Sequence, residues 1–122
     1  MPIQSNITAA DEWFSGTDKV VQFTITDFAG VAQNITGWAL RFVLTRRGSL
    51  TALIEKTVGA GIAITNGAGG ICQVSITDTD TNNLPTYGLD PAYEYELRRT
   101  DDGNEDVLAY GSVVLLQGKV TT

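Results

Sequence analysis

The sequence predicts an all-β fold, a β-sandwich of about seven antiparallel strands. Short alternations of apolar and polar residues recur along the chain, and each is typical of a strand with one buried face. Turn-forming residues separate these alternations, including 13 glycines among 122 residues. No stretch shows a convincing amphipathic helix, so strands at this short spacing point to a sandwich or a barrel.

The central strand is expected at 38–45, where the bulkiest apolar side chains alternate with other residues. Its core-facing positions are Trp38, Leu40, Phe42 and Leu44. Arg41 and the other intervening residues should point away from the core. We interpret this strand as the centre of the sandwich.

The remaining strands are placed by the same period of two. They are expected at 20–26, 53–58, 62–64, 72–76, 93–97 and 107–116. Glu55 and Lys56 suggest that 53–58 is an edge strand, because charged side chains discourage further pairing. Gly111 predicts a bulge or a close backbone contact. The chain is then one domain, with an N-terminal arm or edge strand at 1–15, the sandwich at 16–116 and a tail at 117–122.

The charge balance argues against nucleic acid as a partner. The formal net charge is −6, and non-specific nucleic-acid binding needs lysine and arginine to neutralise phosphates. The N-terminus has neither the basic region nor the apolar core of a signal peptide. No apolar run is long enough to cross a membrane, so a membrane partner is not expected either.

Few residues could support catalysis or hold a metal. The chain has no histidine, and its one cysteine, Cys72, lies on the apolar face of a predicted strand. Asp78, Asp80 and Asn82 begin like a calcium loop, but Asn83 and Leu89 stand where glycine and glutamate are needed. A capped helical turn is the better interpretation. We therefore expect no enzyme activity, no cofactor and no metal.

Six residues are candidates for contact with a partner. They are Trp13, Phe14, Arg46, Arg47, Arg98 and Arg99. The two arginine pairs either match carboxylates on a neighbouring subunit or blunt the ends of strands. The two aromatic residues either form a docking surface or cap the open end of the sandwich.

The order of turn and strand signals resembles a known group. The signals are a Gly-Thr-Asp turn before 21–27, Ile35-Thr36-Gly37, Leu40-Arg41-Phe42, Val74-Ser75-Ile76, Tyr93 to Leu97, an Asp-Gly hairpin and Tyr110-Gly111. Over 16–116 they resemble the immunoglobulin-like N-terminal domain of phage upper baseplate proteins and related small tailed-phage virion proteins.

This resemblance implies an immunoglobulin-like sandwich and a non-enzymatic structural protein of a tailed bacteriophage virion. A tail, baseplate or fibre-attachment component is implied, with capsid decoration (a cement protein) as the alternative. Its partners would be other virion proteins and copies of itself in a symmetric homo-oligomer. The protein would be located in the virion after synthesis in the bacterial host cytoplasm.

A carbohydrate-binding β-sandwich module is an alternative from a different class of function, because fold alone does not determine function. Such a site needs exposed aromatic residues grouped on one face. The candidates are Trp13, Phe14, Tyr87 and Tyr110.

Overall fold

The computed structural model describes residues 10–14, 16–87 and 92–116, and most of them lie in β-strands. The strands are β1 (Ala10–Phe14), β2 (Lys19–Thr24), β3 (Leu40–Arg46), β4 (Ile54–Val58), β5 (Gly61–Asn66), β6 (Ile71–Ile76), β7 (Tyr93–Arg99) and β8 (Asp106–Leu116). A four-residue helix, α1 (Asp78–Thr81), lies between β6 and β7. None of the described helical structure is long and apolar enough to span a membrane.

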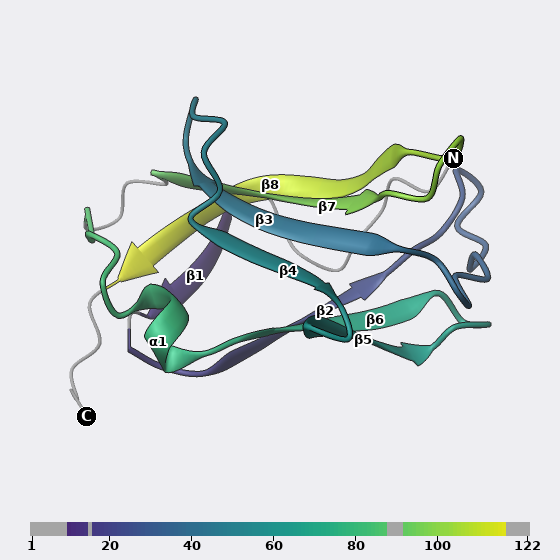
Figure 1. Ribbon diagram of the computed structural model, residues 1–122, viewed down its shortest axis with the longest axis horizontal. Coiled ribbons are helices and arrows are strands. Elements are labelled where there is room, and N and C mark those ends of the chain that lie inside the picture. Colours follow the sequence, from purple (N-terminus) through teal and green to yellow (C-terminus); the bar gives the residue numbers. More distant parts are fainter. Residues whose placement is uncertain (1–9, 15, 88–91, 117–122) are drawn as a thin grey trace.

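The predicted immunoglobulin-like sandwich of about seven antiparallel strands is wrong. All eight described strands belong to one mixed sheet in the order β1-β8-β7-β3-β4-β5-β6-β2. The sheet bends around the core until it is nearly closed into a barrel, with β3, β7 and β8 above and β2, β5 and β6 below in the view of Figure 1. Two pairings are parallel, those of β1 with β8 and of β4 with β5.

A tight turn between β4 and β5 makes the sheet continuous. Thr57 pairs with Gly61 and Val58 with Ile62, so the two sides of the molecule share backbone hydrogen bonds. Gly61 has φ +108°, and a Cβ at this position would collide with the Lys56 side chain. Hydrophobic periodicity marks this glycine-rich segment only as a break between strands. The periodicity gives no sign that β4 and β5 pair with each other across the segment.

The alternation predicted for the central strand is confirmed from its start at Leu40. Leu40, Phe42 and Leu44 are buried, while the residues between them are half-buried. Trp38 precedes the strand and is only half-buried. Strand β4 is not an edge strand, because it lies between β3 and β5, and the edges are β1 and β2.

An aromatic cluster fills the centre of the core. The Phe42 ring lies 6.3 Å from that of Trp13 and 5.9 Å from that of Tyr95, both in stacked geometry. Phe23, from β2 on the other side of the molecule, lies 6.2 Å from Phe42 and 5.8 Å from Tyr95. The rings therefore join β1, β2, β3 and β7 around one apolar centre.

Cys72 also lies in this core and is fully buried. Burial raises the pKa of its thiol to about 11. Because the thiolate is the reactive form, the side chain acts as a small apolar group.

A second link between the two sides of the molecule is polar. Lys56 Nζ on β4 lies 2.8 Å from Asp80 Oδ2 on α1. Asp80 also accepts a hydrogen bond from the backbone N–H of Thr77, whose hydroxyl caps the same helical turn. The segment 78–82 is thus a capped helical turn, as predicted.

The Lys56–Asp80 link predicts a specific loss of stability in acid. Burial favours the neutral form of Asp80, but the hydrogen bonds from Lys56 and Thr77 outweigh it and hold the pKa of Asp80 below its ordinary 3.8. The stabilisation is therefore present above the pKa of the unfolded chain and is lost as pH falls through the folded pKa. Asp80→Asn should lower the free energy of unfolding at pH 7 and flatten its decline in acid, as measured by urea unfolding at several pH values.

Asp102→Asn, in the exposed β7–β8 hairpin, is the control, and it should keep the acid dependence of the wild type. A decline in acid as steep in Asp80→Asn as in the wild type would show that the link contributes nothing.

Gly111 makes a close contact, as predicted, but with the Tyr95 ring and not with another stretch of backbone. Gly111 pairs with Tyr95, and a Cβ on it would lie 2.7 Å from Tyr95 Cε2. Gly111→Ala should therefore reduce the free energy of unfolding by about 1–3 kcal/mol, because the tyrosine ring must move. The measurement is chemical denaturation of dilute protein.

Ser112→Ala, at the next position of β8, is the matched control and should change stability by less than about 0.5 kcal/mol. In a Tyr95→Leu background, Gly111→Ala should cost less than in the wild type. The same cost in both backgrounds would contradict the contact.

Candidate functional site

We call the solvent-facing side of β4, β3, β7 and β8 the outer face. Cross-strand pairing aligns one row of side chains on it, Glu55, Val43, Glu96 and Tyr110. The neighbouring row is Thr57, Arg41, Arg98 and Val107. A row rich in glutamate therefore lies beside a row that contains two arginines.

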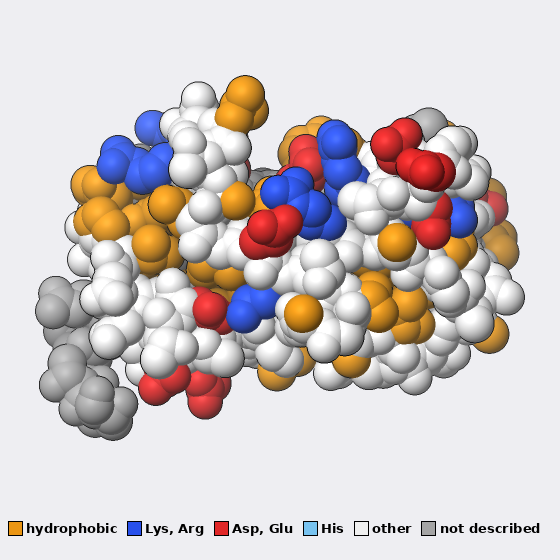
Figure 2. All heavy atoms as spheres, in the orientation of Figure 1, with side chains coloured by type: hydrophobic (Ala, Val, Ile, Leu, Met, Phe, Trp, Pro, Cys, Tyr) orange, Lys and Arg blue, Asp and Glu red, His pale blue; other side chains and the backbone are white. Residues whose placement is uncertain are grey.

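Two ion pairs connect these rows within the chain. Arg41 Nε lies 2.5 Å from Glu55 Oε2, and Arg98 Nε lies 3.2 Å from Glu96 Oε1. All four side chains are between 37% and 51% exposed, so each pair contributes little to folding stability. Figure 2 shows acidic and basic side chains next to one another in the middle of its view. These charges remain accessible to a partner.

Tyr110 is the most exposed aromatic side chain among the described residues, at 80%. It stands on β8 directly opposite Glu96. Tyrosine and arginine are enriched in protein interfaces, whereas lysine and glutamate are depleted. The two rows carry one tyrosine and two arginines and contain no lysine, but they also hold two glutamates.

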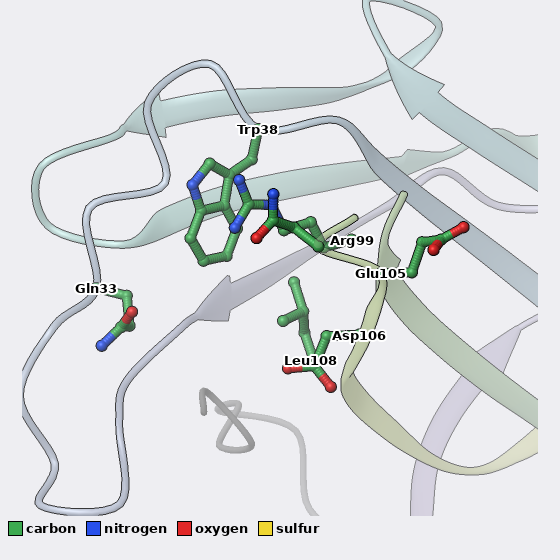
Figure 3. A pocket seen from close by; sticks show the side chains of 7 residues that line it. Gln33, Trp38, Arg99, Glu105, Asp106 and Leu108 are labelled. Carbon is green, nitrogen blue, oxygen red and sulfur yellow. The ribbon is translucent and has the colours of Figure 1, made fainter. Parts of the chain in front are cut away.

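A hollow of about 260 Å³ lies at the end of the molecule where β3 begins and β7 ends. We call it the end hollow. Its lining residues are Gln33, Trp38, Arg99, Asn104, Glu105, Asp106 and Leu108. Figure 3 shows Gln33 on one side, Leu108 and Asp106 on the other, and the Trp38 indole above them.

Arg99 is already engaged by its neighbours in this hollow. Its guanidinium carbon lies 4.0 Å from the centre of the Trp38 ring, and its Nε lies 2.7 Å from Asp101 Oδ2. Two hydrogen bonds lower the pKa of Asp101, and the one from Arg99 has a larger effect than the one from the Ala39 N–H. The carboxylate of Asp101 therefore matches the positive charge of Arg99.

The other arginine pair lies at the opposite end of β3. Arg46 Nη1 donates a hydrogen bond of 2.7 Å to Tyr87 Oη, and its guanidinium carbon lies 4.8 Å from the Tyr87 ring centre. Arg47 is exposed, and its backbone N–H bonds Ala92. Arg98 and Arg99, although adjacent in sequence, belong to the outer face and the end hollow respectively.

The structure does not bring the six predicted contact residues together. Trp13 is 1% exposed and belongs to the core, whereas Phe14 is 47% exposed at the end of β1. The aromatic residues considered for a sugar site are also separated. Tyr87 contacts Arg46 at one end, and Tyr110 stands on the outer face.

Sequence reasoning misses most of the end hollow. The period-two pattern assigns Trp38 to the core, and Gln33 and Asn104 belong to no pattern of their own. Arg99, one of the six candidate contact residues, and the Asp-Gly hairpin at 101–106 are the visible signals. Among the described residues, no group of three histidine, cysteine, aspartate or glutamate side chains could hold a metal ion.

Comparison with known proteins gives a likeness of fold only. No family model matches the chain, and no curated protein matches it. Among solved structures, 261 chains match. One belongs to a structure described as the basis of T cell specificity and activation by the bacterial superantigen toxic shock syndrome toxin-1. It has a TM-score of 0.53 and 11% identity, and the match covers 95% of this chain and all of the other.

These findings overturn the resemblance to phage baseplate domains. The structural likeness lies elsewhere, and the eight strands form one nearly closed mixed sheet. The assignment to a bacteriophage virion depended on that resemblance and is withdrawn with it. The turn-and-strand signals that carried the resemblance are shared by many β-proteins. Such signals therefore do not specify function.

Proposed function

We propose that this chain is a non-enzymatic structural domain that associates with copies of itself through the outer face. The observation that supports this most is the self-complementary arrangement of its charges. A two-fold axis that lies in the plane between two facing copies, parallel to the rows and midway between them, places the glutamate row of one copy over the arginine row of the other. Arg41 and Arg98 would then meet Glu55 and Glu96 of a second molecule.

Tyr110 and Val43 supply apolar contact within this arrangement. Both lie in the row that also holds the glutamates, and Tyr110 is largely exposed. An aromatic anchor surrounded by charges of both signs is a common basis for specific association.

The dimensions of the face favour weak association. Four strands about 4.8 Å apart and about 20 Å long give a surface at the low end of specific interfaces. A dissociation constant of roughly 10–1,000 µM is therefore expected for one contact.

A role without catalysis is supported by the chemistry of the described side chains. The one thiol is buried and has a raised pKa. The carboxylates Glu55 and Glu96 are paired with arginines on an open, solvated face. Neither setting activates a nucleophile or a general base.

The test is the oligomeric state over a range of protein concentrations. Sedimentation equilibrium should show a monomer–dimer equilibrium that weakens at high salt. Tyr110→Ala should weaken the dimer at least about tenfold, because it removes the aromatic anchor. Arg98→Glu should weaken it as well, and the double variant with Glu96→Arg should restore it, because the exchanged charges are again complementary.

Phe28→Ala is the matched control, since Phe28 is another aromatic residue, 73% exposed, outside the outer face. It should leave the dimer unchanged. A wild-type chain that stays monomeric at about 1 mM, or an equal effect of the Phe28 and Tyr110 substitutions, would contradict the proposal.

A further inference from the structure

We propose that the end hollow binds one neutral sugar residue and discriminates against acidic sugars. Its size sets the first limit. At about 260 Å³ it lies just below the ~300–1,000 Å³ of typical small-molecule pockets, so it fits a single sugar ring. The hollow does not depend on self-association, because it lies at an end of the molecule and not on the outer face.

The lining offers the mixture of groups that a sugar needs. Gln33 and Asn104 carry amides that both donate and accept hydrogen bonds. The carboxylate of Asp106 accepts hydrogen bonds from hydroxyl groups, whereas Figure 3 shows the carboxylate of Glu105 turned away from the other lining side chains. Figure 3 places Gln33 on the side of the hollow opposite Asp106, so a ring between them would meet polar groups at two edges.

The Trp38 indole gives the hollow its apolar surface. Trp38 is half-buried, and the Arg99 guanidinium lies 4.0 Å from its ring centre and covers one face of the ring. Leu108 also lines the hollow, but at 1% exposure it closes the wall and offers no contact surface. The carbon–hydrogen groups of a sugar can pack against the open part of the indole while its hydroxyl groups meet the amides.

The balance of charge predicts the selectivity. Of the seven described lining residues, Arg99 is the basic one, and Asp101 outside the lining already matches its charge. Glu105 and Asp106 add two carboxylates. A uronic acid or sialic acid would therefore be repelled, whereas a neutral sugar would not.

The test uses the full chain labelled with ¹⁵N and titrated with single sugars. The probes are glucose, galactose, mannose and N-acetylglucosamine as neutral sugars, glucosamine as a cation, and glucuronic acid and N-acetylneuraminic acid as anions. At least one neutral sugar should shift the amide signals of Trp38 and 104–106. The anions should bind at least about fivefold more weakly at low salt, and the gap should narrow at high salt.

Variants separate the lining from the rest of the chain. Asn104→Ala, in the exposed hairpin, should weaken binding of the neutral sugar at least about fivefold. Asp106→Asn should reduce the difference in affinity between neutral and acidic sugars. Glu94→Gln is the matched control, because it removes one negative charge at the opposite end of β7. It should change neither the affinity for the neutral sugar nor the difference in affinity between neutral and acidic sugars.

Each outcome decides the inference. If no sugar at about 50 mM shifts the amide signals of the hollow, the inference is overturned. Binding of glucosamine alone would assign the hollow to amines, such as a lysine side chain of a partner protein, and would overturn it too. Equal binding of acidic and neutral sugars would refute the predicted selectivity.

Discussion

The packing of four aromatic rings is the constraint on which this structure depends. Trp13, Phe42 and Tyr95 come from strands on one side of the molecule, and Phe23 comes from β2 on the other. Bringing the Phe23 ring within about 6 Å of those of Phe42 and Tyr95 requires the sheet to bend back on itself. The turn between β4 and β5 allows that bend without breaking the sheet. The Lys56–Asp80 ion pair adds a polar link between the same two sides.

Because the core takes every second residue of β3 and β7, the outward residues of these strands are fixed as well. Phe42 and Tyr95 point inward, so Val43 and Glu96 must point outward and lie opposite each other. The surface proposed for self-association is therefore a consequence of the core. A change of one residue in the pairing would exchange the two faces and destroy both. Folding and the proposed function thus depend on the same alternation.

Much of the strand content could be predicted from the sequence, because period-two burial is a local signal. The spans of β3, β6, β7 and β8 follow from that signal, whereas the close contact at Gly111 is indicated by a glycine inside a strand. The single continuous sheet does not, because it depends on two parallel pairings between segments that have no mutual pattern. The error in the resemblance had the same origin, since it compared local signals and not the pairing of strands.

The candidate surfaces could be predicted only in part. Arg98 stands out because basic residues are scarce, but its position beside Glu96 and Arg41 follows from strand register. The end hollow combines a loop, two strand ends and a hairpin, so no single stretch of sequence predicts it.

The most direct test of self-association through the outer face is a search for contacts between two copies of the chain in solution. Isotope-labelled and unlabelled protein would be mixed at high concentration, and filtered nuclear Overhauser spectra would report contacts only between different molecules. Contacts are expected from the Tyr110 ring of one copy to outer-face side chains of another, including the Val43 methyl groups. Intermolecular contacts confined to other exposed side chains, such as Phe28 or Leu50, or no such contacts at all, would contradict self-association through this face.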